Sequence, residues 1–595
     1  MAFLDAYEIY PPWNWDWRDF TIPSPEGNYS VVGPVKDQGV CGSCFIFGPV
    51  ATMESAFMLS LQNDRLNQTL FSEQSAKKFA SIWPHTQNPH LQETFLVINS
   101  KNFTIIAADP SCDLIKEAIK RYEDRLFVQD CHKLNPNFKG KPFYSHALNH
   151  AIEKDFAGEL KNLTIKFNGK CEHLPHMNMM EKYSLVIDAH HGAQIVGESV
   201  WGALRGLETF SQMVVNSGLN EFIINTGKLE DWPRFSHRGF LVDTARHFQP
   251  LHLLLQTLDA MEMNKLNVFH WHIVDDQAFP FESTTFPDLS KKGAYNPTMV
   301  YSKADVDHLL EYARLRGIRV LVEFDSPGHT QSWGPGEPSG SLLTPCFDKE
   351  GKEHGHGPID PTVESNYDFI KKLFTEVSHR FPDQYLHLGG DEVSFDCWKS
   401  NPNITAFMTA HRMVGNYSQL ESLYIQKVLD IVSGLRKSYI VWQEVLDNKA
   451  ALKPDTVVHV WIQDTWQKEI ARATASGYRT LLSAPWYLDW VSWGQDWVRY
   501  YETDPLGFNG TEAQKALVLG GEACLWAEYV DGSNLISKSW PRASAIAERL
   551  WSSSTHKKAS EARGRFHGQF CRMQRLGIRG GPIDGPGFCL CDGAL

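Results

Sequence analysis

The sequence lacks a long apolar run. None of its hydrophobic stretches reaches the ~18 residues that a membrane-spanning helix requires, so no membrane span is expected. It also lacks clusters of positive charge: 57 lysines and arginines are dispersed among 70 acidic residues, and the formal net charge is −13. Nucleic acid is therefore not expected as a partner. With 595 residues, 42% of them hydrophobic, the chain is long enough for two or three globular domains.

The N-terminus lacks a recognisable signal peptide. Its first residues, MAFLDAYEIYPPWNWDWRDF, contain neither the basic region nor the uninterrupted apolar region of such a peptide. Sequons of the form Asn-X-Ser/Thr nevertheless favour the secretory route. There are seven: Asn28, Asn67, Asn102, Asn162, Asn403, Asn416 and Asn509. We expect a lysosomal or secreted protein whose signal peptide was lost or lies outside this sequence.

Residues 33–44 read GPVKDQGVCGSC and precede an apolar pattern that predicts a buried helix. A cysteine at the start of a helix suits a thiolate nucleophile, because the helix N-terminus stabilises negative charge. The segment resembles the nucleophile region of papain-like cysteine proteases. The resemblance makes Gln38 the oxyanion-hole glutamine and Cys44 the nucleophile.

A protease of this kind also needs a histidine base and an orienting asparagine from far along the chain. No later segment resembles the histidine strand of that family, and VSWGQDW at residues 491–497 has the Ser-Trp-Gly of the other segment without its asparagine. We therefore interpret residues 1–80 as an inactive protease-like fragment. A bifunctional enzyme remains the alternative.

Residues 81–234 mix strand-like and helix-like segments. ETFLVI, LTIKF and YSLVIDA have the β pattern, whereas DLIKEAIKRYEDRLF and ESVWGALRGLETFSQMVV have the helical one. This mixture predicts a small α+β domain. The segment DWPRF at residues 231–235 ends it, because proline breaks regular structure.

Residues 235–595 show a repeating rhythm of short apolar runs separated by helix-like segments. Eight runs are nearly continuous in apolar character, as strands covered on both sides by helices should be. They are GFLVDTAR, LNVFHWHIVDD, IRVLVEFDSPGH, YLHLGGDE, YIVWQEV, VVHVWIQD, RTLLSAPWY and LGGEACLWAE. Eight β/α repeats predict a TIM (β/α)8 barrel as the catalytic domain.

Polar and aromatic residues stand at the ends of these runs. In a TIM barrel the C-terminal strand ends converge on one mouth. Carboxylates and tryptophans gathered there suit a pyranose, whose C–H face packs on aromatic rings and whose hydroxyls bind carboxylates. The candidates are Asp243, Arg246, Asp275, Asp325, His329, Asp391, Glu392, Trp442, Trp461, Tyr487, Asp489, Trp526 and Glu528.

Six motifs resemble the β-N-acetylhexosaminidases of glycoside hydrolase family 20. They are HRGFLVDTARHF, HWHIVDDQ, HLGGDEV, WQEV, LLSAPWYLD and GGEACLWAEYVD, and the likeness runs from about residue 82 to 589. The resemblance implies removal of terminal N-acetylhexosamine with retention, the acetamido oxygen of the substrate acting as nucleophile. A sugar-binding pseudoenzyme is a further alternative. Glycoprotein, glycolipid and chitin fragments all present the same terminal sugar.

The resemblance also implies residue roles. Glu392 would be the general acid/base, Asp391 would hold the acetamido N–H, and Tyr487 would donate to the acetamido oxygen. His329 would lie behind Glu392 and tune its proton. Substrate-binding roles fall to Trp442, Trp461 and Trp526 as walls of the acetamido pocket, to Arg246, Asp275 and Glu528 as partners of ring hydroxyls, and to Asp489 near the sugar 6-position.

No cofactor is implied by this chemistry. The pairs HWH (His270 to His272) and HGH (His354 to His356) invite a zinc hypothesis, which we reject because the first lies along a strand and the second in a glycine-rich loop without usable acid or cysteine ligands. Eleven cysteines leave at least one unpaired in a monomer. The resemblance implies a homodimer and three disulfides: Cys112 with Cys171, Cys346 with Cys397, and Cys571 with Cys589.

Overall fold

The structure is a computed structural model that describes residues 81–127, 155–216, 222–490, 495–583 and 589, together with two short antiparallel strands, β1 (Thr21–Ile22) and β2 (Tyr29–Ser30). The chain divides into two units, residues 1–79 with 146–154 and residues 80–145 with 155–595. Cys44 and Gln38 lie outside the described residues. The predicted catalytic and substrate-binding residues all belong to the second unit.

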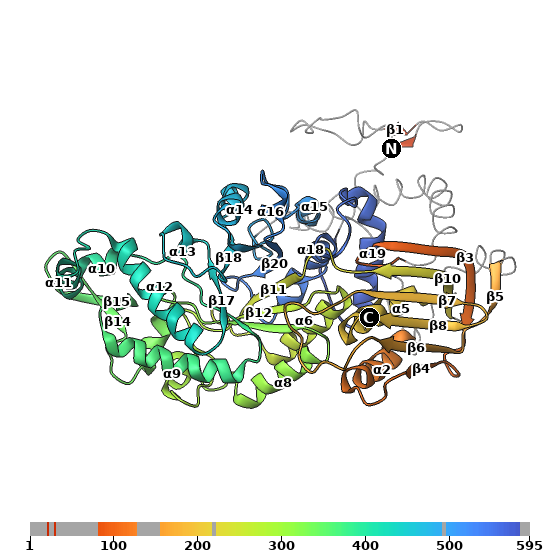
Figure 1. Cartoon of the computed structure of the whole chain (residues 1–595), viewed down its shortest axis with the longest axis horizontal. Helices are drawn as coiled ribbons and strands as arrows, with labels where there is room; N and C mark the ends of the chain where they lie inside the picture. The colour runs from red at the N-terminus through yellow and green to blue at the C-terminus, as the bar shows by residue number, and fades with distance from the viewer. Residues whose placement is uncertain are drawn as a thin grey trace, which may run out of the picture. The chain divides into compact units, whose positions relative to one another are not determined.

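An eight-stranded sheet with two helices forms the first part of the second unit (Figure 1), which confirms the predicted α+β region. The strand order is β4-β6-β8-β7-β10-β3-β5, with β9 paired to β10. Three strands and both helices were predicted, whereas β4, β5, β8, β9 and β10 were not. The elements are β3 (Asn88–Ile98), β4 (Thr104–Ala107), α2 (Asp113–Leu126), β5 (Phe156–Glu159), β6 (Asn162–Phe167), β7 (Tyr183–Asp188), β8 (Gly192–Gly197), α5 (Val200–Met213), β9 (Val215–Asn216) and β10 (Phe222–Asp231).

Helix α5 is buried on nearly every face because it lies between the sheet and the barrel. Its glycines permit this packing: a Cβ added to Gly202 would come within 2.2 Å of the Lys182 carbonyl oxygen. On its other side Arg205 donates to the carbonyl oxygens of Arg316 and Gly317 at 3.1 and 2.8 Å. The helix therefore joins the α+β region to the barrel.

The eight predicted apolar runs form a closed parallel barrel, so the TIM-barrel prediction is confirmed. Strands β11, β12 and β13 are buried at every residue, because helices cover the outer face of the barrel and packed side chains fill its interior. The strands are β11 (His237–Asp243), β12 (Val268–His272), β13 (Arg319–Glu323), β16 (Tyr385–His387), β17 (Ser438–Trp442), β18 (Val457–Val460), β19 (Arg479–Leu482) and β20 (Val518–Leu525). The main outer helices are α6 (Leu251–Met263), α8 (Lys303–Arg314), α9 (Glu364–Arg380), α12 (Tyr417–Gly434), α14 (Trp466–Ala475), α15 (Asp496–Glu502), α18 (Arg542–Trp551) and α19 (Ala559–Arg575).

The end of the barrel where the strands begin is closed by an apolar plug. Met177, from the loop between β6 and β7, packs with inward-facing side chains of the barrel. These are Val268, Leu321, Tyr385, Ile440, Val457 and Leu481. The α+β region thus supplies part of the barrel floor.

Buried ion pairs reinforce the contact between the two regions. Asp231, the last residue of β10, lies 2.8 Å from Nζ of Lys265 and accepts from the Tyr183 hydroxyl at 2.7 Å. Glu181 lies 2.6 Å from Arg238 and 2.9 Å from Arg205. All of these side chains are buried, so the α+β region and the barrel share one charged interior.

The structure forms the three disulfides that the resemblance implied, Cys112–Cys171, Cys346–Cys397 and Cys571–Cys589. His354 and His356 are not in a loop as expected. They lie in β15 (Glu353–Ile359), which pairs with β14 (Leu343–Phe347). The first four residues of β15 are exposed, so the strand shows no alternating apolar pattern in the sequence. Within the described ranges, no helix is long and apolar enough to span a membrane.

Candidate active site

A glycine turn follows strand β16 at the mouth of the barrel. Gly389 and Gly390 have φ angles of +66° and +94°, which glycine adopts at little cost. A Cβ on Gly389 would lie 1.7 Å from Oδ1 of Asp325, and the N–H of Gly390 donates to the same oxygen at 2.7 Å. The turn frees Asp391 and Glu392 from strand geometry, which would point consecutive side chains to opposite faces.

His329 lies against both of these adjacent acids. Its Nε2 is 3.8 Å from Oδ2 of Asp391 and 3.7 Å from Oε2 of Glu392, and its Nδ1 is 3.2 Å from Oδ1 of Asp275. Burial alone would lower the pKa of His329, but the carboxylates of Asp391 and Asp325 raise it to about 11. The ring is therefore an imidazolium that balances the negative charge of the mouth.

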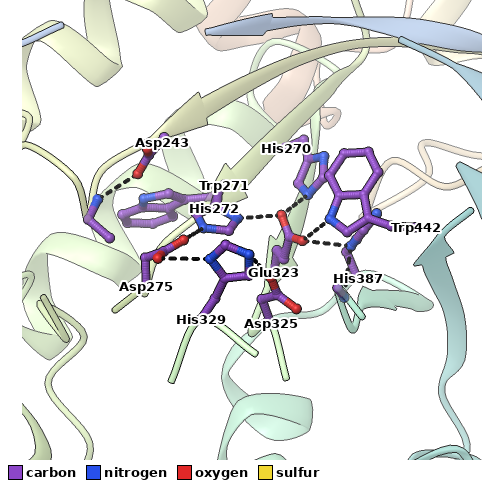
Figure 2. Close-up of polar contacts among 12 residues, drawn as sticks. Asp243, His270, Trp271, His272, Asp275, Glu323, Asp325, His329, His387 and Trp442 are labelled. Atoms are coloured by element: carbon purple, nitrogen blue, oxygen red, sulfur yellow. Dashed lines mark hydrogen bonds and ion pairs between the residues drawn. The ribbon is translucent and has the colours of Figure 1, made fainter. Parts of the chain in front are cut away.

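Asp275 is fully buried, and both of its carboxylate oxygens are engaged. Besides His329, it contacts Nε2 of His272 at 2.7 Å and Nη2 of Arg246 at 2.9 Å (Figure 2 shows the two histidine contacts). Burial would raise the pKa of Asp275, but hydrogen bonds from His272 and His329 hold it well below its usual value. This differs from the expected role as a partner of sugar hydroxyls, because no oxygen of Asp275 faces the solvent.

Arg246 is clamped between two acids and an indole ring. Its Nη1 lies 3.1 Å from Oδ2 of Asp243, opposite the contact with Asp275. Its guanidinium carbon sits 5.1 Å from the ring centroid of Trp526. Although burial opposes it, the charges of Asp243, Asp275 and the exposed Glu528 raise the pKa of Arg246. The clamp fixes a planar donor fork at the mouth.

Aromatic rings surround Tyr487. Trp461 and Trp526 lie 6.4 and 6.5 Å from it between centroids, and Trp442 lies 6.0 Å from Trp526. Trp442 is almost completely buried, whereas Trp461 and Trp526 are partly exposed. Burial raises the pKa of the Tyr487 hydroxyl well above its usual value, so this hydroxyl remains a hydrogen-bond donor.

Asp489 and Trp490 follow this aromatic group. Oδ1 of Asp489 accepts from the backbone N–H of Trp526 at 3.5 Å. Burial raises the pKa of Asp489 to about 6. The Trp490 ring is 45% exposed and lies 5.7 Å from that of Tyr487. A substituent on a bound ligand near Asp489 would therefore meet a carboxyl group whose charge depends on pH.

Three residues with evident roles in this arrangement were not singled out from the sequence. Oε2 of Glu444 accepts from the indole N–H of Trp461 at 2.8 Å, and Oε1 of Gln443 accepts from the Trp461 backbone N–H at 3.1 Å. Glu323, the last residue of β13, accepts from the indole N–H of Trp442 at 2.8 Å. The motif WQEV could have indicated Glu444 and Gln443, because two polar residues end an apolar run there.

A parallel barrel whose mouth combines adjacent acids, a clamped arginine and several indole rings defines an enzyme that hydrolyses glycosidic bonds. Residues 235–554 match the family described as "Glycosyl hydrolase family 20, catalytic domain", and residues 82–213 match "beta-acetyl hexosaminidase like". The chain belongs to glycosyl hydrolase family 20. Residues 11–76 match "Papain family cysteine protease", as the N-terminal motif indicated.

Curated relatives extend over most of the chain. It is 47% identical to the mouse beta-hexosaminidase subunit beta over 515 residues, which are 86% of this chain and 93% of the relative. It is 46% identical to the bovine subunit alpha over 524 residues, with 86% and 96% covered. Among solved structures, Flavobacterium johnsoniae chitobiase has a TM-score of 0.70 at 28% identity, covering 84% of this chain and 73% of that one.

Proposed function

We propose that the barrel removes terminal, non-reducing N-acetylhexosamine residues from glycoconjugates with retention of configuration. The observation that carries this is the pair of adjacent acids, Asp391 and Glu392, on a glycine turn beside one protonated histidine at 3.8 and 3.7 Å. Two carboxylates on one turn can act on one sugar in different roles. That is what a mechanism with a neighbouring acetamido nucleophile requires.

The reaction proceeds in two steps. Glu392, 61% exposed, donates its proton to the leaving oxygen while the acetamido oxygen attacks C1 and forms an oxazolinium-like intermediate. Asp391, only 13% exposed, accepts the acetamido N–H and stabilises the positive charge. The Tyr487 hydroxyl orients the attacking oxygen. Water then attacks C1, and the Glu392 carboxylate takes its proton.

The remaining mouth residues hold the sugar. Arg246 and Glu528 bind ring hydroxyls, and Trp442, Trp461 and Trp526 enclose the acetamido methyl group. Asp275 acts through its neighbours: it fixes His329 and Arg246, which differs from the role expected from the sequence. A pseudoenzyme is disfavoured because each of the mouth residues that the resemblance requires is present.

Compartment and assembly are part of the same proposal. The three disulfides support an oxidising compartment, lysosomal or extracellular. A homodimer stays a prediction. The natural substrate is a glycan ending in N-acetylglucosamine or N-acetylgalactosamine, whether carried by protein, lipid or a chitin fragment.

Paired substrates test the proposed function. The enzyme should hydrolyse 4-nitrophenyl N-acetyl-β-glucosaminide and release the β-anomer first, as NMR would detect. The matched β-glucoside, which has no acetamido group, should be cleaved at least ~10²-fold more slowly, since it lacks the nucleophile. A thiazoline mimic of the intermediate should inhibit. Equal rates on the two glycosides, or first release of the α-anomer, would exclude substrate assistance.

Charge at Asp489 predicts a pH-dependent preference for neutral sugars. At ~4 Å and an effective dielectric of about 20, a carboxylate repels a 6-sulfate by about 4 kcal/mol, which water and ions reduce to ~1 to 3 kcal/mol. Above pH 6, where Asp489 is ionised, kcat/KM should favour neutral over 6-sulfated substrates by roughly ten- to a hundredfold. Below pH 6 protonation removes the charge, and the preference should fall.

Steady-state kinetics on a matched neutral and sulfated pair at pH 5 and pH 7 provides the measurement. Asp489→Asn should abolish the pH dependence of the preference for the neutral substrate. The further change Trp490→Arg should favour the sulfated substrate. Equal kcat/KM for the pair in the unmutated enzyme at pH 7 would be incompatible with this role of Asp489.

The protease-like segment should contribute nothing to glycoside hydrolysis. Cys44→Ala, or removal of residues 1–78, should leave kcat/KM on N-acetylglucosaminides within about twofold, because the predicted site lies in residues 235–595. The Cys44 thiol should also fail to react with an active-site-directed protease label. Labelling that Cys44→Ala abolishes would favour the bifunctional alternative.

A further inference from the structure

We propose that Glu323, buried inside the barrel, is a positioning residue that holds the acid/base side and the acetamido side of the mouth in register. This inference rests on the proposed function. Glu323 is the last residue of β13 and is completely buried, so it does not touch a substrate. Its two carboxylate oxygens bind two different sets of neighbours, and each set leads to a different part of the mouth (Figure 2).

One oxygen leads to the acid/base side. Oε2 lies 2.6 Å from Nδ1 of His272, and Nε2 of the same ring lies 2.7 Å from Asp275. Asp275 in turn holds His329 and Arg246. A shift of Glu323 would therefore pass through one ring, that of His272, and one carboxylate, that of Asp275, to the histidine that faces Glu392.

The other oxygen leads to the acetamido side. Oε1 accepts from the indole N–H of Trp442 at 2.8 Å. Indole N–H groups only donate, so this orientation of Trp442 requires an acceptor at that position. Trp442 lies 6.0 Å from Trp526 between ring centroids. Glu323 thus fixes the position of Trp442 in the wall of the predicted acetamido pocket. At the same time it fixes His272, which leads through Asp275 to His329.

Charge explains why a carboxylate suits this position. Burial would raise the pKa of Glu323, but His387 and His272 hold it well below its usual value, so the group stays ionised. Burial likewise would lower the pKa of His272, which Glu323 and Asp275 raise to about 10. Among the described residues, the groups that face His272 are these two carboxylates and, edge-on at 4.9 Å, the ring of Trp526. His272 is therefore protonated and donates from both nitrogens.

A glutamine has the shape of glutamate but only one accepting oxygen. In Glu323→Gln either Trp442 or His272 must lose its acceptor, because both donate to this side chain. We expect kcat/KM on a natural disaccharide to fall about 10²-fold, as misplacement of reacting groups by ~1 Å can cause. We also expect weaker inhibition by the thiazoline mimic. Without the neighbouring charge, the pKa of His272 should fall toward its usual ~6.5, which adds an ionisation to the pH profile of kcat/KM.

Glu522 offers a matched control in the same barrel. It is equally buried and also binds two rings, with oxygens 2.5 Å from Nε2 of His237 and 2.7 Å from Nδ1 of His270. Among the described residues it contacts neither His272 nor Trp442, although Nε2 of the His270 ring that it binds lies 3.1 Å from Oε2 of Glu323. Glu522→Gln should lose thermal stability as Glu323→Gln does, yet keep the unmutated pH profile and the unmutated affinity for the thiazoline.

The experiment compares both variants with the unmutated enzyme by thermal unfolding, by pH profiles and by thiazoline inhibition. Equal losses of kcat/KM in the two variants with unchanged pH profiles would overturn the proposal and leave Glu323 a structural residue. If Glu323→Gln does not fold, His272→Gln cuts the same chain and should change the pH profile; an unchanged profile would also overturn it. Failure of the proposed function is distinguishable, because the unmutated enzyme itself would then be inactive.

Discussion

Replacing Glu392 by glutamine should reduce kcat/KM on a natural N-acetylhexosaminide by about 10²- to 10⁴-fold, the usual contribution of general acid/base assistance. The side chain is 61% exposed and its ion-pair partner, His329, is 3.7 Å away. The change should therefore leave folding intact. Glutamine cannot donate an acidic proton to the leaving oxygen, so the loss should be largest for poor leaving groups and smaller for activated aryl glycosides.

The control for this variant is Glu512→Gln, another exposed glutamate, whose side chain is 91% exposed and paired with Lys515. It should behave as the unmutated enzyme. Asp391→Asn should instead mainly slow the acetamido step and weaken thiazoline binding. A loss below tenfold for Glu392→Gln on a poor leaving group would contradict the assignment of the acid/base.

Replacing Asp231 by alanine should lower the free energy of unfolding by roughly 3 to 5 kcal/mol, because it leaves the buried charge of Lys265 without its partner. Oδ2 of Asp231 lies 2.8 Å from that ammonium group, and neither side chain is exposed. Asp231 also accepts from the Tyr183 hydroxyl at 2.7 Å and from the Trp551 indole N–H at 3.0 Å. The Trp551 indole N–H would lose its acceptor inside the protein, whereas Lys265 would keep the Tyr183 hydroxyl at 3.0 Å and that hydroxyl would keep Thr209 at 2.6 Å.

Urea denaturation followed by tryptophan fluorescence measures this effect as a lower transition midpoint. The exposed ion pair of Lys120 with Glu117, whose side chains are 70% and 38% exposed, provides the comparison. Glu117→Ala should change the free energy of unfolding by less than ~1 kcal/mol, as exposed pairs do. A midpoint for Asp231→Ala equal to that of Glu117→Ala would show that the interface charge is solvated.

The barrel could be predicted from the sequence because its strands are covered on both sides and therefore appear as uninterrupted apolar runs. The short strands β4 and β5 could not, because half of their residues face solvent and they are only four residues long. Hairpin β14–β15 was not predicted from the sequence for a related reason. Its mostly exposed second strand carries the histidines and glycines of HGH, a composition that is typical of a loop.

The candidate site was predictable where residues end an apolar run of the sequence and much less so where they lie within one. Glu323 stands within IRVLVEFDSPGH, and its direction depends on which face of the strand turns inward. The sequence also could not show that both carboxylate oxygens of Asp275 are bound by His272, His329 and Arg246, because those partners come from three separate loops and strands. Composition can indicate a carboxylate at the mouth, but only the packed barrel decides whether that carboxylate faces a sugar or its own neighbours.

The plug formed by Met177 has a consequence for protein engineering. A barrel excised at residue 235 would lose this stopper and would uncover Arg238 and Lys265, whose partners Glu181 and Asp231 belong to the discarded segment. The truncated protein would expose an apolar surface at the floor of the barrel, surrounded by cations that have lost their ion-pair partners. Such a surface favours aggregation. The smallest portable catalytic cassette therefore begins near residue 81, and chimaeras between related enzymes should exchange both regions together.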